Sequence, residues 1–297
     1  MRLGIGLTQR HQPELAQRVE RIGFDSLWVG GHVLWHRPML DPLTQLAAYA
    51  AVTETILLGT SVLVLPLYPP ALIAKSTVTV DVISGGRTVL GVGVGGENPA
   101  EFELMGVPVG ERGARSTEAI RLIRALWSGT PVEHAGRYYE VPTVAMSPLP
   151  AQAGGIPIWV GGRSPAALRR AAAHGDGWLG IFLSPERYAV ALGELREQRA
   201  ALGRDTAELR AAHYLWVRVG SSDAKALADA REYLQSSYSR SFTDVQVRDF
   251  CVTGTAEHVR QQLDLYERAG CEHVILKSAC PGEALAEHVE VLGRLLH

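Results

Sequence analysis

Cysteine is scarce in this sequence of 297 residues, with only Cys251, Cys271 and Cys280 present. Three cysteines are too few for a disulfide framework, and none forms a C-x-x-C metal pair. Long apolar runs are also missing, because prolines interrupt the longest one, around Leu57–Ile73. A membrane-spanning helix needs about 20 consecutive apolar residues, so we expect no membrane partner.

An excess of charge of one sign is absent too. The chain has 29 basic and 31 acidic residues and a net charge of −2, which leaves no positive field for nucleic acid. The opening residues MRLGIGLTQ lack the layout of a signal peptide and favour a strand, so we expect a cytoplasmic protein. The hydrophobic fraction of 46% is that of an ordinary globular chain.

Several catalytic motifs are missing. The sequence contains no H-E-x-x-H, no G-x-S-x-G and no G-x-x-x-x-G-K-[ST]. Histidines such as His134 and His258 lack ligand spacing, and His36 follows His32 in a segment that leads into Pro38, so we expect no metal. An open dinucleotide-binding sheet would show G-x-G-x-x-G after its first strand, but here Thr8 and Gln9 follow.

What the chain does contain is a regular alternation of β-prone runs and helical patterns, which indicates a parallel sheet covered by helices. Eight such units without a composition break favour one (β/α)8 TIM barrel over residues 1–297. The expected strands are Leu3–Leu7, Asp25–Val29, Ile56–Leu63, Arg87–Val94, Ile156–Gly161, Gly177–Ile181, Tyr214–Val219 and Glu272–Leu276.

Two irregular segments interrupt the alternation. Gly136–Pro150 has the pattern of an inserted hairpin, because Tyr138 and Tyr139 are β-prone and prolines follow. Tyr233–Asp249 is expected to be a polar linker between two helical patterns. We expect both insertions, about 136–150 and 233–249, at the C-terminal face of the barrel, where they would line the mouth of a substrate site.

The active site of a barrel is built from the loops at the C-terminal ends of its strands. His32 follows the second strand after a glycine pair, where it could exchange a proton near neutral pH. A packing or surface histidine is the alternative. Trp35 and the segment Val62–Leu65 are expected to wall the pocket.

Glycines mark two further loops at this end of the barrel. Gly93, Gly95 and Gly96 would let a ring or a phosphate approach the backbone closely. Gly161, Gly162, Arg163 and Ser164 lead into a helix that begins with Pro165, which predicts a phosphate cradle. The alternative for the second loop is a well-capped helix without a ligand.

Taken together, these segments resemble the luciferase-like monooxygenase superfamily, and within it the F420-dependent oxidoreductases. The resemblance runs from the first strand through the sixth and again over Val252–Leu276. Its most specific pieces are GFDSLWV (23–29), LGTSVL (58–63), SGGR (84–87), LGVG (90–93), IWVGG (158–162) and GDGW (175–178).

The resemblance implies roles for individual residues. It implies a non-proline cis peptide at Ser61–Val62, in a bulge against the coenzyme ring, and a coenzyme phosphate held by the 161–164 turn. It places His32 at the position where F420-dependent members carry a histidine that faces the coenzyme ring and the substrate. The residue before His32 is Gly31, whereas relatives usually carry an acidic residue there. Glu97 lies near the position of a catalytic glutamate, with the register shifted by one.

The function implied is hydride transfer between C5 of coenzyme F420 and a small substrate with a C=C, C=N or alcohol/ketone group. Alternatives are an FMN-dependent two-component monooxygenase of the same superfamily and a non-catalytic binding relative. Sugar-phosphate oxidation would require a cationic cluster, for which Arg218 and Lys277 are candidates. The resemblance also implies a homodimer.

Overall fold

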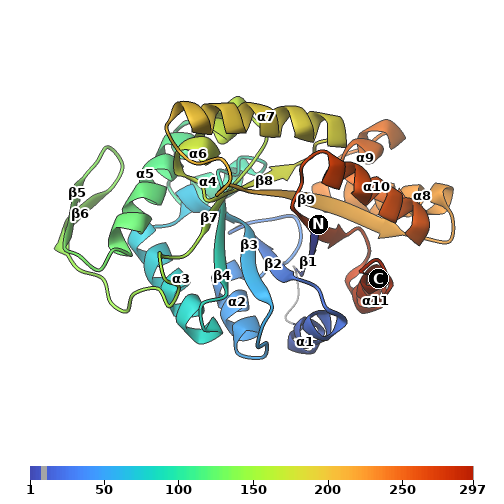
Figure 1. Cartoon of the computed structure of the whole chain (residues 1–297), viewed down its shortest axis with the longest axis horizontal. Helices are drawn as coiled ribbons and strands as arrows, with labels where there is room; N and C mark the ends of the chain where they lie inside the picture. Colours follow the sequence, from blue (N-terminus) through green and yellow to red (C-terminus); the bar gives the residue numbers. More distant parts are fainter. Residues whose placement is uncertain (8–11, 297) are drawn as a thin grey trace.

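The computed structural model describes residues 1–7 and 12–296, so Thr8 and Gln9 lie outside the described residues. Eight parallel strands of this part of the chain close a barrel in the order β1-β2-β3-β4-β7-β8-β9-β11, with β11 pairing back to β1 (Figure 1). These strands are β1 (Arg2–Gly6), β2 (Ser26–Gly31), β3 (Leu57–Val64), β4 (Thr88–Gly93), β7 (Ile158–Gly161), β8 (Gly177–Ile181), β9 (Arg210–Val219) and β11 (His273–Ser278).

Helices surround the barrel (Figure 1). Two of them end at a glycine, Gly23 and Gly85, which have φ of 100° and 68° and so adopt the left-handed region. The helices are α1 (Pro13–Ile22), α2 (Pro42–Ala50), α3 (Pro70–Ser84), α4 (Pro99–Leu104), α5 (Arg112–Leu126), α6 (Pro165–His174), α7 (Pro185–Ala201), α8 (Asp223–Tyr238), α9 (Asp244–Phe250), α10 (Ala256–Arg268) and α11 (Leu285–Gly293). Among the described residues, no helix combines the length and the apolar character that crossing a membrane requires.

The inside of the barrel is filled by a layer of large side chains below the C-terminal ends of the strands. The rings of Trp28 and Trp159 lie 5.0 Å apart, and both are buried. A Cβ atom at Gly59 would lie 2.2 Å from the Trp28 ring, so only glycine leaves room for this tryptophan. This packed layer closes the barrel from below and leaves space for a ligand only above it.

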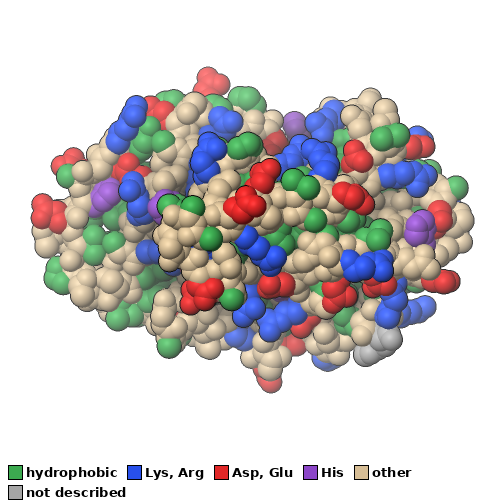
Figure 2. All heavy atoms as spheres, turned by 45° about the horizontal axis from the view of Figure 1, so that its top comes forward, with side chains coloured by type: hydrophobic (Ala, Val, Ile, Leu, Met, Phe, Trp, Pro, Cys, Tyr) green, Lys and Arg blue, Asp and Glu red, His purple; other side chains and the backbone are tan. Residues whose placement is uncertain are grey.

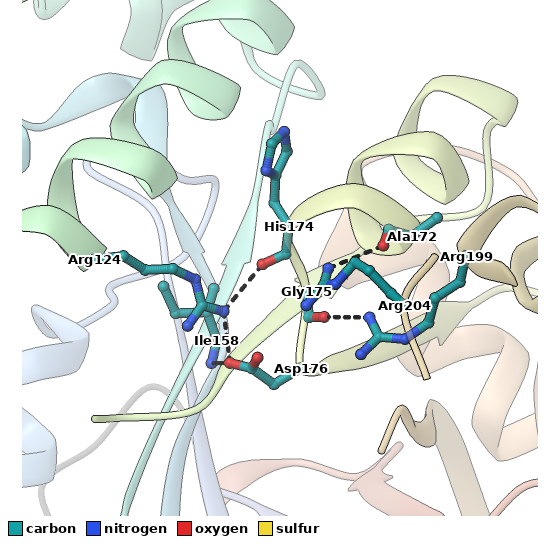
Figure 3. Close-up of polar contacts among 8 residues, drawn as sticks. All are labelled: Arg124, Ile158, Ala172, His174, Gly175, Asp176, Arg199 and Arg204. Carbon is teal, nitrogen blue, oxygen red and sulfur yellow. Dashed lines mark hydrogen bonds and ion pairs between the residues drawn. The ribbon is translucent and has the colours of Figure 1, made fainter. Parts of the chain in front are cut away.

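The motif Gly175–Trp178 lies at the N-terminal end of the barrel strands, where it supports the fold. The Asp176 carboxylate accepts hydrogen bonds from the backbone N–H of Ile158, at 2.8 Å, and from the Arg124 guanidinium, at 2.6 Å (Figure 3). Arg124 also donates to the carbonyl of His174, and Arg199 donates to that of Gly175. The network fixes the start of β7 and β8, the N-terminal end at which barrels carry stability rather than catalysis.

The insertion at 136–150 was expected at the C-terminal face, and that expectation was wrong. Its hairpin, β5 (Val132–Ala135) with β6 (Glu140–Val144), joins the end of α5 to β7 and projects beyond α5 (Figure 1). Just after it, Gln152 donates to the carbonyl of Thr88, the first residue of β4. The turn of the hairpin packs back against the first half of α5, where the Glu118 carboxylate accepts from the backbone N–H groups of Tyr138 and Tyr139, so the hairpin covers the outer side of this helix and does not line the mouth.

The segment 233–249 is not the polar linker that the sequence suggested. Helix α8 continues through Tyr238, and α9 begins with a capping box in which Thr243 and Gln246 bond reciprocally. A short ninth strand, β10 (Cys251–Gly254), then pairs with β9 outside the barrel. Aromatic side chains of this segment pack over the end of β9, which places it beside the candidate site as expected.

Three buried histidines predict a loss of stability in acid. Burial lowers the pKa of His213, His273 and His288 from 6.5 to about 4. Between these values the unfolded chain binds more protons than the native one, so stability falls as pH drops from 6.5 toward 4. Each histidine is expected to contribute on the order of 1–3 kcal/mol. Urea unfolding at pH 7, 6 and 5 measures the loss.

His288 provides the control for this prediction. Its Nε2 accepts the Val219 N–H at 3.0 Å, so the neutral ring is the form that fits. A His288→Gln variant is expected to lose less stability between pH 7 and 5 than the wild type. An unchanged slope in this variant would contradict the role assigned to His288, whereas replacement of the exposed His36 is expected to leave the slope as it was.

Candidate active site

A cavity of about 240 Å³ opens at the C-terminal ends of the barrel strands. Its floor is asymmetric, because glycines lie on the side of β2, β4 and β7, and bulky side chains lie on the side of β8, β9 and β11. The lining residues are Gly30, Gly31, His32, Trp35, Met39, Ser61, Val62, Val64, Gly93, Val94, Gly95, Glu97, Gly161, Gly162, Leu179, Ile181, Phe182, Tyr214, Trp216, Ser237, Tyr238 and Lys277.

A bulge at the end of β3 enters this cavity. The Ser61–Val62 peptide bond is cis, as the sequence resemblance implied, and the pairing with β4 shifts register between Gly59 and Leu63. The Val62 side chain rests against two glycines, since a Cβ at Gly93 or Gly161 would lie 2.4 Å or 2.8 Å from its methyl groups. The glycines therefore let Val62 lie across the floor of the cavity.

His32 lines the cavity and has a carboxylate partner. Its Nδ1 lies 3.0 Å from Oε1 of Glu101, a fully buried side chain of α4. Since a carboxylate accepts, His32 donates from Nδ1 and keeps Nε2 for the cavity. The His32 ring also stacks on Trp35, with centroids 4.1 Å apart and an angle of 25° between the planes.

Glu101 is the site residue that sequence reasoning missed. The acid next to His32 in relatives is Gly31 here, and the orienting carboxylate comes instead from 69 positions along the chain. Asn98 helps to place it, because it caps α4 and its side-chain amide donates to the Leu34 carbonyl at 2.9 Å. The Asn98–Pro99 pair that begins α4 was visible in the sequence as a helix start, but the contact of this helix with the loop after β2 was not.

Glu97, the carboxylate predicted as catalytic, also lines the cavity, although it makes no contact with His32. Its charge acts on Tyr238: burial, with smaller contributions that include Glu97, raises the pKa of that phenol to about 12. The geometry gives Glu101 the contact with the histidine.

The predicted phosphate cradle is a tight turn at the edge of the cavity. Gly161 and Gly162 line it, and Gly162 has φ of 123°. Ser164 caps α6 by accepting from Ala167 N at 3.2 Å, and Arg163 donates to the carbonyl of Phe182 at 2.8 Å. Arg163 and Ser164 lie just outside the lining, as does Gly96, which contacts Arg112 instead.

An aromatic wall covers the side of β8 and β9. Phe182, Tyr214, Trp216 and Tyr238 form it, and the Phe182 and Tyr238 rings meet at 6.1 Å. Alternation along β9 could have predicted the inward position of Tyr214 and Trp216. Tyr238 belongs to the segment that had no predicted helix, so its place could not be foreseen.

Polar atoms in the cavity are few. The hydroxyls of Ser61 and Ser237 are buried and accept or donate no hydrogen bond within the described residues. Lys277 lies in the floor, and burial lowers the pKa of its ammonium to about 7. Arg218 does not line the cavity but pairs with Asp229 at 3.0 Å, so the two candidate cations do not form a cluster.

Elsewhere in the described residues there is no candidate metal centre, and the face of the molecule in Figure 2 is not dominated by basic side chains. No group of three His, Cys, Asp or Glu side chains within residues 1–7 and 12–296 could hold a metal ion. Lys and Arg side chains are interspersed with Asp and Glu over the face in Figure 2.

Known proteins resemble the chain in both sequence and fold. An F420-dependent glucose-6-phosphate dehydrogenase from Amycolatopsis mediterranei is 36% identical over 176 residues, which cover 56% of this chain and 51% of that protein. The chain thus spans about half the length of the curated relatives it matches.

Two solved structures share the fold. An F420-dependent secondary alcohol dehydrogenase in complex with an F420–acetone adduct superposes with a TM-score of 0.87 at 22% identity, covering 99% of this chain and 97% of that one. The monooxygenase RslO1 from Streptomyces bottropensis superposes with a TM-score of 0.85 at 24% identity, covering 100% and 98%. The luciferase-like monooxygenase family model matches residues 4–273, and the chain therefore belongs to this family.

Proposed function

We propose that this protein is an F420-dependent oxidoreductase that transfers a hydride between the coenzyme and a small organic substrate. The observation that carries the proposal is the His32–Glu101 pair, which presents a histidine nitrogen to a cavity bordered by the Ser61–Val62 bulge. Curated relatives named as F420-dependent dehydrogenases support the choice of coenzyme.

The residues present fit a planar ring system. Val62 on its glycine support, at Gly93 and Gly161, provides a flat apolar contact on one side of the cavity. The buried Ser61 hydroxyl has no partner within the described chain and could bond to a polar ring edge. The turn at Gly161–Ser164 would hold a phosphate beside the ring, as backbone N–H groups ahead of a helix do elsewhere.

When bound, F420 supplies C5 of its deazaflavin ring as a two-electron hydride carrier. His32 provides the matching proton chemistry. In alcohol oxidation, Nε2 of His32 takes the proton from the hydroxyl oxygen while the hydride leaves the carbon that bears this hydroxyl. In reduction, the carbonyl carbon receives the hydride and Nε2 returns a proton to the oxygen. Glu101 holds the ring through Nδ1, which keeps one tautomer in place and stabilises the imidazolium that forms.

The walls of the cavity favour an apolar substrate. Ring and thioether surfaces come from Phe182, Trp216 and Met39. Among the described residues, the lining contains one Lys or Arg side chain, that of Lys277. A sugar phosphate would require several cationic partners, and Arg218 is engaged with Asp229. We therefore expect a ketone, an enone, an imine or the corresponding alcohol with an apolar body.

Titration of the purified protein with F420 and with FMN, followed by fluorescence quenching, tests the coenzyme. We expect F420 to bind at least about tenfold more tightly than FMN, a difference of about 1.4 kcal/mol. Preference for FMN would instead favour the two-component monooxygenase, and the fold shared with the monooxygenase RslO1 is the reason to test this alternative. Binding of neither would favour a non-catalytic relative. The expected homodimer is tested on the same sample by light scattering.

A further inference from the structure

Three arginines from separate segments of the chain gather beside the aromatic wall. The Arg163 guanidinium lies 5.4 Å from the centroid of the Phe182 ring and donates to the Phe182 carbonyl. The Arg240 guanidinium lies 4.4 Å from the Phe242 ring and 5.9 Å from the Tyr238 ring. Because the Phe182 and Tyr238 rings contact each other, the two guanidinium groups stand on adjoining surfaces.

Arg187 is the third member. It lies in the first turn of α7, where its backbone N–H donates to the Ser184 cap, five positions after Phe182. The charges of Arg187 and Arg240, after burial, lower the pKa of Arg163, so the three side chains share one electrostatic environment. All three residues are exposed to solvent.

The protein does not neutralise this group itself. In the described chain, no Asp or Glu forms an ion pair with Arg163, Arg187 or Arg240, although other arginines such as Arg231 and Arg218 are paired. The neighbouring Glu186 accepts from the Ser184 hydroxyl at 2.8 Å. Three like charges held close together are unfavourable by themselves, and a bound anion would offset their repulsion.

The arginine group lies at the rim of the cavity. Phe182 and Tyr238, the rings that support Arg163 and Arg240, both line the cavity, and Arg163 follows the Gly161–Gly162 turn directly. A ligand whose ring fills the cavity and whose phosphate reaches this turn would continue outward over the three guanidinium groups. The chemistry expected of that continuation is a chain of carboxylates.

We propose that Arg163, Arg187 and Arg240 bind the glutamate-bearing tail of the coenzyme and so distinguish F420 from FMN. F420 extends beyond its phosphate with γ-linked glutamates, whereas FMN ends in a single phosphate, so only F420 can place carboxylates on this group. The inference rests on the proposed function, and it adds the part of the protein that recognises the tail.

The test compares the affinities of three ligands by fluorescence titration: F420 with several glutamates, F420 without glutamates, and FMN. Each is measured at low and high salt on the wild type and on an Arg187→Gln/Arg240→Gln double variant. Arg163 is left in place because it also belongs to the phosphate turn. The control is Arg196→Gln, an exposed residue of α7 about 13 Å further along the helix.

We expect the double variant to bind tailed F420 about fivefold more weakly at low salt, as the loss of two exposed ion pairs would cause. That difference should shrink at high salt because exposed charges are screened. Tail-free F420 should bind the wild type and both variants equally. Two outcomes would overturn the tail site alone: equal affinity of the wild type for tailed and tail-free F420, or an equal loss of affinity for both forms in the double variant. Failure of every F420 form to bind would overturn the proposed function as well.

Discussion

Replacement of His32 by alanine is expected to lower kcat for alcohol oxidation or ketone reduction by about 10²–10⁴-fold, the usual contribution of a positioned general acid or base. The reason is that Nε2 of His32 is the ring nitrogen left for the cavity, while Nδ1 is bonded to Glu101. Stopped-flow measurement of the change in F420 absorbance under single-turnover conditions follows this step directly.

The matched control is His36→Ala, because His36 lies four residues further on, is exposed and does not line the cavity. It is expected to retain activity within about twofold, as surface changes do. The affinity of the His32→Ala variant for F420 should change far less than its kcat. An equal loss in affinity and none in kcat would show that His32 holds the ligand and moves no proton.

Glu101→Gln is expected to lower kcat by about 10–100-fold, by analogy with the loss seen when the carboxylate partner of a metal-bound histidine is removed. Glutamine keeps the size of the buried side chain but removes the charge that stabilises imidazolium, and its amide can donate to the ring as well as accept. Because Glu101 acts through His32 and touches no reacting atom, it is a positioning residue.

NMR of the histidine ring nitrogens separates positioning from a general loss of structure. The wild type should show His32 protonated on Nδ1, and Glu101→Gln should show a mixture of tautomers while the resonances of other histidines stay in place. Glu103→Gln, an exposed residue of the same helix, serves as the control. Full activity with an unchanged His32 tautomer in Glu101→Gln would remove Glu101 from the mechanism.

The sequence predicted His32 because the position of a histidine after a barrel strand is a local property. Glu101 could not be found in the same way, because its contact with His32 depends on how α4 folds back over the β2 loop through Asn98 and Leu34. The glycines of the floor were recognised, but their purpose was not. Only the structure reveals that Gly93 and Gly161 make room for Val62.

The eight strands were predicted closely because apolar runs in a parallel barrel are short and bounded by turn residues. The hairpin at 136–150 had the right local structure, and the error concerned where it packs, since it covers the outer side of α5 instead of lining the cavity. Its position after α5 and before β7 was the signal that separates it from the loops that follow the barrel strands. The start of α9 could have been predicted from the capping-box pattern of Thr243 and Gln246. It was missed because the segment was judged by its polar composition.

The β5–β6 hairpin has a practical consequence for handling the protein. It projects beyond α5 (Figure 1), its turn at 136–139 packs on the outer side of that helix, and none of its residues lines the cavity that contains His32. Exposed loop tips tolerate insertions better than any other part of a domain. An affinity peptide or a resin linkage placed in this turn would attach the protein through the outside of its helix layer without occupying the cavity, so that a packed bed could be supplied with ligands in flow.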